Sequence, residues 1–259
     1  MDDNTLWIYL HPPRTGGGTI LNTLEREIPK EEIFSTSVVR YQKKPEKFDP
    51  NKVRFIIGHA TYYGIHKLVP SRNPKYFIFL RDPAERIVSY YNAKMLETKK
   101  IIPFEDWYKK QMKNDMVHFM NLKYKGYASS RTPVPSVFMP IIRKLNYKAF
   151  FFLQTIALKF MNKTKKIELS KLENAKKLLD LCWFVGIIEN SDEDVPFLFK
   201  SMGLKNPEWK KTTLSKKVIK VDDKLRKKIY DENLLDVELY NYAQNLRKKF
   251  YSNQGIKSS

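Results

Sequence analysis

A run of small residues between an apolar stretch and a helical pattern has the composition of an anion-binding loop. Residues 7–10 are apolar and bulky, and a helical spacing of apolar residues begins at Ile20. Glycines let the chain turn tightly so that successive N–H groups point at one anion, and a helix that begins there adds its positive dipole end. We therefore predict a phosphate-binding turn, with an ordinary glycine-rich turn as the alternative. Its residues are Arg14, Thr15, Gly16, Gly17, Gly18 and Thr19.

This loop differs from the common nucleoside-triphosphate loop. That loop has a lysine after its last glycine and then a Ser or Thr whose hydroxyl binds magnesium. Here Thr19 follows Gly18, and the basic residue, Arg14, precedes the glycines. The sequence favours a reaction that uses a basic residue ahead of the loop and no magnesium. A P-loop nucleotide kinase is kept as an alternative.

A second group suited to anions follows the apolar run 76–80. Arg81 and Asp82 come directly after this run, and Ser89 lies seven residues beyond Asp82. A guanidinium can bind a phosphate through two parallel hydrogen bonds. Asp82 is a suitable cap for a helix with Pro83 in its first turn, and Ser89 then lies two turns along that helix. We predict that Arg81 and Ser89 bind a phosphate; a structural Arg81–Asp82 ion pair is the alternative.

One histidine is placed where a general base is expected. His59 follows the apolar run 53–57 and Gly58. Imidazole suits proton transfer because its reference pKa of about 6.5 is close to working pH. His11, just before the glycine loop, and His66, in an expected helix, compete with it. Isolated histidines are more often structural, so residue type alone does not identify which of the three is the general base.

The polar clusters each follow an expected strand, and in open parallel sheets ligands bind beyond the carboxyl ends of the strands. The pattern adds a strand at 182–188, helices at 102–126, 169–181 and 192–202, and a C-terminal helical pair at 222–250. The length of 259 residues suits one α/β domain, 1–259. We predict a P-loop-like three-layer fold with a central, mostly parallel sheet flanked by helices. The proline-containing, apolar and basic segment 129–166 is expected to be a helical insertion.

Composition narrows the partner without naming it. The formal net charge of +20 predicts an anionic substrate or surface, and a noncatalytic nucleic-acid binder is a further alternative. The single cysteine allows no intrachain disulfide, and neither a signal-peptide pattern nor a membrane-spanning run is present, so a cytoplasmic protein is expected. No spacing of His, Cys, Asp and Glu is typical of a metal site.

Four segments together resemble the carbohydrate sulfotransferase family, which includes the heparan sulfate 2-O- and 6-O-sulfotransferases and bacterial relatives. They are HPPRTGGGTI, IIGHATYYGIH, YFIFLRDPAERIVSYYN and WFVGIIENSDEDVPFLFKSMGL, and the C-terminal LLDVELYNYAQNL is also similar. The most specific is RDPAERIVSYY. This resemblance covers nearly the whole chain except 129–166.

The resemblance implies a donor, 3′-phosphoadenosine 5′-phosphosulfate, and no metal. Residues 14–19 would hold its 5′-phosphosulfate, and Arg81 and Ser89 its 3′-phosphate. His59 would be the catalytic base and His11 a structural histidine. Arg14 would stabilise charge on the bridging oxygen, although the family usually has lysine there and threonine in place of Gly18.

The acceptor implied by the resemblance is a hydroxyl of a carbohydrate. The positive charge suits an acidic glycan, and nucleic acid is then an unlikely partner. Residues 134–166 could bring the protein to a membrane-linked glycan or form a buried helical hairpin.

Overall fold

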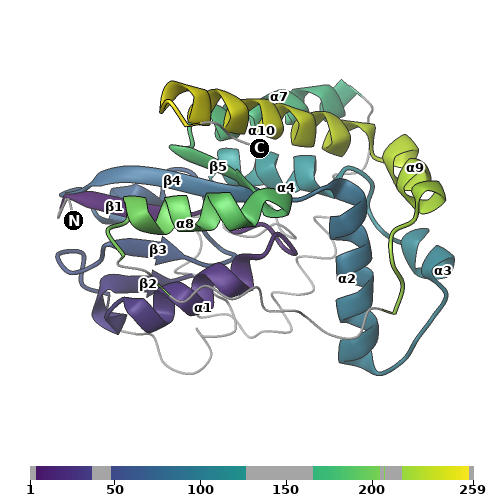
Figure 1. Ribbon diagram of the computed structural model, residues 1–259, viewed down its shortest axis with the longest axis horizontal. Helices are drawn as coiled ribbons and strands as arrows, with labels where there is room; N and C mark the ends of the chain where they lie inside the picture. Colours follow the sequence, from purple (N-terminus) through teal and green to yellow (C-terminus); the bar gives the residue numbers. More distant parts are fainter. Residues whose placement is uncertain (1–3, 37–47, 127–165, 205–206, 208–217, 257–259) are drawn as a thin grey trace. The chain divides into compact units, whose positions relative to one another are not determined.

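The computed structural model describes residues 4–36, 48–126, 166–204, 207 and 218–256 (Figure 1). The segment 129–165 of the expected insertion lies outside the described residues. The strands are β1 (Thr5–Tyr9), β2 (Ile33–Ser35), β3 (Phe55–Ile57), β4 (Asn73–Leu80) and β5 (Phe184–Ile187). The α-helices are α1 (Gly17–Glu27), α2 (Pro83–Thr98), α3 (Phe104–Tyr108), α4 (Asp115–Tyr124), α7 (Lys166–Asp180), α8 (Ser191–Ser201), α9 (Asp223–Glu232) and α10 (Leu234–Asn253). Short 3₁₀ helices are η1 (Lys30–Glu32), η3 (Ile65–Leu68) and η5 (Ile188–Asn190).

The fold is α/β, built on a five-stranded parallel sheet in the order β2-β3-β1-β4-β5. β1 is central, and its five residues are all buried. Strands covered on both faces read as continuous apolar runs, which explains why β1, β3 and β4 are visible in the sequence. The predicted fold class is confirmed.

The chain forms two compact units. The first comprises residues 1–11, 28–78 and 117–183, and it contains β1, β2, β3 and most of β4. Trp7 is paired with Phe55 on one side and with Lys75 on the other, so β3 and β4 flank β1 in register. In the same unit the amide of Asn174 in α7 hydrogen-bonds the amide oxygen of Asn121 in α4.

The second unit comprises residues 12–27, 79–116 and 184–259. Here α8 and α10 pack on β5, and α2 packs on α9. The side chain of Asp82 caps α2 by accepting a hydrogen bond from the Glu85 amide at 2.9 Å. Its core between α2, α3 and α9 combines aromatic side chains such as Tyr91 and Trp107 with aliphatic ones such as Ile229.

The elements depart from expectation in three places. β2 was not predicted, because its three residues lie within a polar, proline-containing connection. The helix expected over 102–126 is two helices, α3 and α4. The strand expected at 182–188 is shorter, Phe184–Ile187, whereas the predicted C-terminal helical pair is confirmed as α9 and α10.

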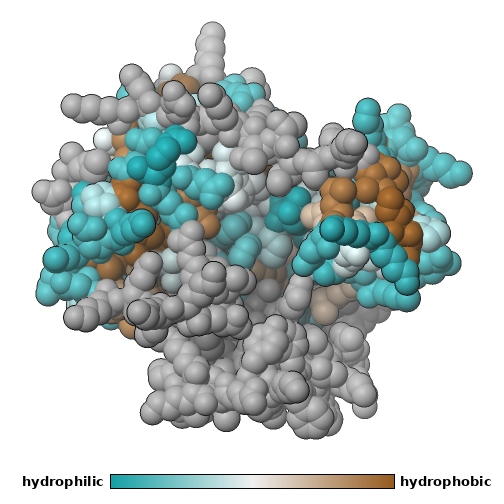
Figure 2. All heavy atoms as spheres, turned by 90° about the horizontal axis from the view of Figure 1, so that it is seen from below, coloured by the Kyte–Doolittle hydropathy of each residue, from teal (hydrophilic) through white to brown (hydrophobic). Residues whose placement is uncertain are grey.

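Hydrophobic side chains also reach the surface. Figure 2 shows brown areas separated by hydrophilic residues on the face that it draws. Large exposed side chains such as Ile101, Leu169 and Leu234 lie in different parts of the chain. Within the described part of the chain, no helix has both the length and the apolar character needed to cross a bilayer.

Candidate functional site

The glycine loop is a tight strand-to-helix turn in which two residues have left-handed backbones. Arg14 has a φ of 67° and Gly16 a φ of 72°. A Cβ atom on Gly16 would adopt this strained backbone conformation and would lie 2.5 Å from Cδ1 of Ile188, so glycine is favoured there. A Cβ on Gly18 would meet nothing within 4 Å, which leaves open space beside the start of α1.

Two further contacts hold this loop. The Thr15 hydroxyl donates to the Pro12 carbonyl at 3.0 Å, and the Thr19 amide donates to the Gly16 carbonyl at 3.1 Å. Thr15 is fully buried, so its side chain supports the loop from inside. Because α1 begins at Gly17, the first N–H groups of that helix have no intrahelical acceptor and can bind an anion.

Arg14 contacts Ser89, a pairing that the sequence did not predict, since the two residues were expected to bind different anionic groups. Nε and Nη2 of Arg14 both donate to the Ser89 hydroxyl oxygen, at 3.2 and 3.1 Å. Burial, and then the positive charge of Arg81, lower the pKa of Arg14. Two guanidiniums that repel one another in this way are stabilised when an anion lies between them.

Arg81 has hydrogen-bonding capacity left over. Its Nη2 contacts Glu85 at 3.4 Å, and its Nε is buried without a hydrogen-bond partner. The expected alternative, an Arg81–Asp82 ion pair, is not what these two residues form, because Asp82 pairs with Nη1 of Arg226 at 2.8 Å. A buried donor left unsatisfied is costly, so the Arg81 site is suited to an additional acceptor.

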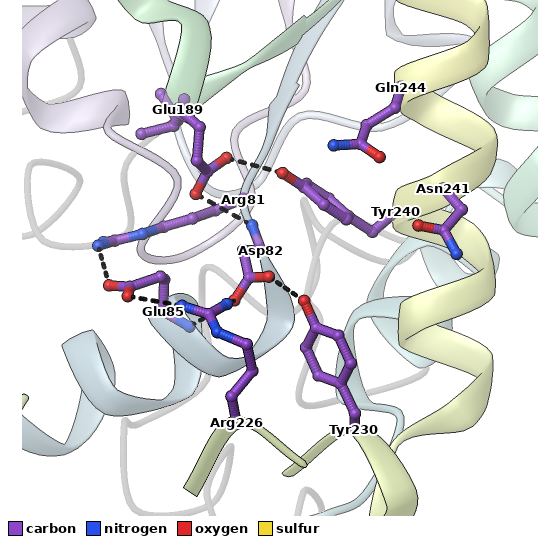
Figure 3. Close-up of a pocket in the computed structure, with 10 residues that line it drawn as sticks. Arg81, Asp82, Glu85, Glu189, Arg226, Tyr230, Tyr240, Asn241 and Gln244 are labelled. Atoms are coloured by element: carbon purple, nitrogen blue, oxygen red, sulfur yellow. Dashed lines mark hydrogen bonds and ion pairs between the residues drawn. The ribbon is translucent and has the colours of Figure 1, made fainter. Parts of the chain in front are cut away.

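A cavity of about 540 Å³ lies beside Arg81 in the same unit (Figure 3). Glu85 lies between Arg81 and Arg226 and contacts both. The lining is mostly polar and comes from the connection between β4 and α2, from α2 itself, and from η5, α9 and α10. It comprises Arg81, Asp82, Glu85, Ile188, Glu189, Arg226, Tyr230, Tyr240, Asn241 and Gln244. Ile188 also contacts the Gly16 position, so the cavity adjoins the glycine loop.

Glu189 is a site residue that the sequence analysis missed. Its carboxylate accepts hydrogen bonds from the Asp82 amide at 3.2 Å and from the Tyr240 hydroxyl at 3.1 Å. Burial raises its pKa, while these hydrogen bonds and the charge of Arg81 oppose the rise. The position of Glu189 just after β5 could have identified it, because ligands of parallel sheets bind beyond the carboxyl ends of the strands.

His59 belongs to the other unit, where its neighbours are His11 and Lys123. The His59 and His11 rings stack with centroids 4.1 Å apart, and Nδ1 of His59 lies 3.3 Å from the His11 carbonyl oxygen. A carbonyl only accepts, so Nδ1 carries the proton and the lone pair of the neutral ring is on Nε2. His59 is exposed and His11 is buried. Burial, then the nearby charges of His59 and Lys123, hold the pKa of His11 well below its usual range.

The third histidine has a different setting. Nδ1 of His66 lies 2.8 Å from the Tyr76 hydroxyl, and η3, which contains His66, is a 3₁₀ helix rather than part of a longer helix. Tyr76 also accepts a hydrogen bond from the Gly64 amide. These contacts fit a structural His66.

Lys123 was also missed. Its side chain is fully buried, and its Nζ donates to the His59 carbonyl at 2.8 Å. Burial lowers the pKa of this ammonium to about 7. Nothing in the sequence distinguishes this lysine, since the chain contains 48 lysines and arginines and most lysines are solvated.

The chain is similar to two solved sulfotransferase structures. Mouse sulfotransferase SULT7A1, crystallised in complex with PAP, is 15% identical with a TM-score of 0.34. That comparison covers 89% of this chain and 64% of the mouse chain, so this chain spans under two thirds of its length. The sulfotransferase from Alicyclobacillus acidocaldarius is 12% identical with a TM-score of 0.43, covering 93% of this chain and 94% of that one. No curated protein matches the chain in sequence.

The sequence also matches the pattern of a protein family. This match extends over residues 8–243, from β1 to α10, and so includes the glycine loop, Arg81 and His59. It covers most of the 259 residues. The chain belongs to the Sulfotransferase family.

Proposed function

We propose that this protein transfers the sulfuryl group of 3′-phosphoadenosine 5′-phosphosulfate to a hydroxyl of a carbohydrate. The observation that carries the proposal is that Arg14, at the start of the glycine loop, hydrogen-bonds the Ser89 hydroxyl while the buried Nε of Arg81 has no hydrogen-bond partner. Such an arrangement suits a ligand with more than one anionic group. Membership of the Sulfotransferase family makes a sulfuryl donor the appropriate candidate.

The residues present fit such a donor. The buried Nε of Arg81 can donate to a phosphate oxygen, and the Ser89 hydroxyl that Arg14 contacts can do the same. The N–H groups at the start of α1, with the open space beside Gly18, fit a second anionic group. The polar cavity next to Arg81 has the volume that small ligands need.

When bound, the donor supplies the sulfuryl group together with a phosphate as leaving group. The acceptor oxygen forms its bond to sulfur as the bond from sulfur to the bridging oxygen breaks. Arg14 and the loop amides of Gly17 and Gly18 stabilise the negative charge that grows on the bridging oxygen. This role needs positioned donors rather than a covalent step by the protein.

We propose His59 as the general base, an assignment that the family resemblance implies. Its support in the structure is the hydrogen bond from Nδ1 to the His11 carbonyl, which leaves Nε2 as the basic atom. Nε2 takes the proton of the acceptor hydroxyl as oxygen attacks sulfur. His59 is exposed, so an acceptor can reach it.

The carbohydrate acceptor is proposed from the same resemblance and from the charge. A formal charge of +20 attracts an acidic glycan at long range, and salt weakens that attraction. Residues 134–166 could contribute to acceptor binding or to contact with a membrane surface. We also propose a cytoplasmic location for the protein.

Calorimetric titration tests the proposal. The ligand is 3′-phosphoadenosine 5′-phosphate, with 5′-AMP and ATP–magnesium as controls that each lack the 3′-phosphate. We expect strong preference for the bisphosphate, because Arg81 and Ser89 add contacts that the controls do not use. Equal binding of all three contradicts the proposal, and metal-dependent ATP turnover favours a kinase instead.

A further inference from the structure

Lys123 is a buried lysine whose side chain ends on a backbone atom of His59. It lies on the last turn of α4, its side chain is fully buried, and Nζ also lies 5.1 Å from the Phe119 ring centroid. The ammonium donates to the His59 carbonyl oxygen at 2.8 Å. Removing an ammonium from water is expensive, so packing alone does not explain a lysine where methionine would fill similar space.

The turn that carries His59 is fixed at several points. Gly58 has a φ of 122°, which a side-chain-bearing residue rarely adopts. The Thr61 hydroxyl contacts the carbonyls of Tyr9 at 2.7 Å and Gly58 at 2.9 Å. These contacts tie the turn to β1.

α4 holds the other side of this turn through Lys123. The Lys123 side chain donates a hydrogen bond to the His59 carbonyl oxygen. The Lys123 carbonyl accepts a hydrogen bond from the Tyr63 amide at 3.0 Å. Holding the carbonyl restricts rotation of its peptide plane about the Cα–C bond of His59, and a restricted backbone limits the rotamers open to the side chain. The His59 ring is then oriented from its backbone by Lys123 and from Nδ1 by the His11 carbonyl.

We propose that Lys123 is a positioning residue for His59: by holding the His59 carbonyl, it keeps the imidazole in the one orientation and tautomer that present Nε2 to the acceptor hydroxyl. The inference rests on the proposed function only for the role of His59 as base. The orientation itself is a property of the protein without any ligand.

The test compares Lys123→Met, which removes the donor and keeps the bulk, with Lys125→Met as the matched control. Lys125 is exposed and lies just beyond the same helix. Nitrogen-15 NMR of labelled histidine reports the tautomer of each ring, and the chain has only 4 histidines to assign. We expect one Nδ1–H tautomer for His59 in the wild type and the control, and averaged tautomers in Lys123→Met.

Transfer kinetics and ligand binding provide the second readout. In Lys123→Met we expect kcat to fall about 10- to 100-fold, the effect of a misplaced catalytic group. The KM for the donor and the affinity for the bisphosphate should stay at the wild-type level. A folded Lys123→Met protein with an unchanged His59 tautomer and unchanged kcat overturns the proposal.

Two provisions keep the test decisive. If Lys123→Met does not fold, Lys123→Gln keeps an N–H donor without the charge, and the proposal expects it to retain one His59 tautomer. A folded glutamine variant with averaged tautomers contradicts positioning by this donor. If the wild type fails to bind the bisphosphate, the proposed function fails, whereas the ring measurement still decides whether Lys123 orients His59.

Discussion

Replacing Arg14 by alanine and by glycine distinguishes the effect of its strained backbone from the effect of its guanidinium. Both variants remove the guanidinium that contacts Ser89 and approaches Arg81. They differ at the backbone, because Arg14 has a φ of 67°, in the left-handed region. That conformation costs a residue with a Cβ about 1–2 kcal/mol. Glycine avoids this cost and loses about 0.5–1 kcal/mol through its greater freedom in the unfolded chain.

Subtracting the middle values of the two ranges predicts that Arg14→Gly is more stable than Arg14→Ala by about 0.75 kcal/mol. In a chain of this size, such a difference raises the melting temperature by about 1–4 °C. Strain of this kind is commonly retained at functional sites, where the surrounding structure and the ligand depend on it.

Binding should change by the same amount in both variants. A hydrogen bond to a charged group contributes about 1.5–3 kcal/mol, and 1.4 kcal/mol corresponds to a tenfold change in Kd. Part of this loss is offset because removing Arg14 also removes its repulsion with Arg81. We therefore expect about 10- to 30-fold weaker binding of 3′-phosphoadenosine 5′-phosphate.

The assays are calorimetric titration with the bisphosphate and thermal unfolding without ligand, on both variants and the wild type. Arg14→Lys keeps the charge but lacks the planar pair of N–H groups that Arg14 presents to Ser89, so its binding should lie between wild type and Arg14→Ala. Wild-type affinity and turnover in Arg14→Ala would refute the assignment of Arg14. Equal stability of the alanine and glycine variants would refute the argument from backbone strain.

Three further results are expected. Gly16→Ala should lower the free energy of unfolding, measured by urea titration, by about 1–3 kcal/mol, because its methyl would lie 2.5 Å from a side-chain carbon. Gly18→Ala is the control, since a methyl there meets open space. Equal effects of the two substitutions would contradict the packing at Gly16. Lys123 has a pKa of about 7 in the folded protein and 10.5 otherwise, so the unfolded chain binds more protons between these values. Its contribution to stability should therefore become more favourable as pH rises from 7 to 10.5, and Lys123→Met should remove that slope from urea titrations at successive pH values. Arg247→Ala should destabilise by about 3–5 kcal/mol, because it leaves the fully buried Asp194 carboxylate without its ion pair, and a urea midpoint near the wild type would contradict this.

The strands with long apolar runs and the helix caps were predictable because they depend on neighbours in sequence. Asp82 caps α2 through an amide only three residues away, and Pro83 suits the first turn. β2 was missed because its three residues become a strand only by pairing with β3. The expected helix at 102–126 is interrupted before α4 by Asn114, whose φ is 52° and whose side chain accepts hydrogen bonds from Leu235 and Asp236.

The candidate site also contains residues that the sequence predicted and residues that it did not. Arg14, Arg81 and Ser89 were expected to bind anions, and the structure places Arg14 on Ser89 and close to Arg81. Their roles toward a donor stay predictions. Lys123 and Glu189 could not be assigned from residue type, because lysines and glutamates are mostly solvated and burial alone distinguishes these two.

The sequence by itself determined which groups are available for anion binding and proton transfer. They are a glycine loop preceded by arginine, an arginine and a serine at an Asp-Pro helix, and a histidine after a strand. Those features are local, and backbone propensities and short spacings decide them. Only the tertiary structure decided that Asp82 pairs with Arg226, that the His11 carbonyl selects the tautomer of His59, and that a lysine from α4 holds the His59 backbone. Each of these contacts joins residues far apart in the chain, and the charge, proton position and orientation of a side chain depend on the groups that folding brings next to it.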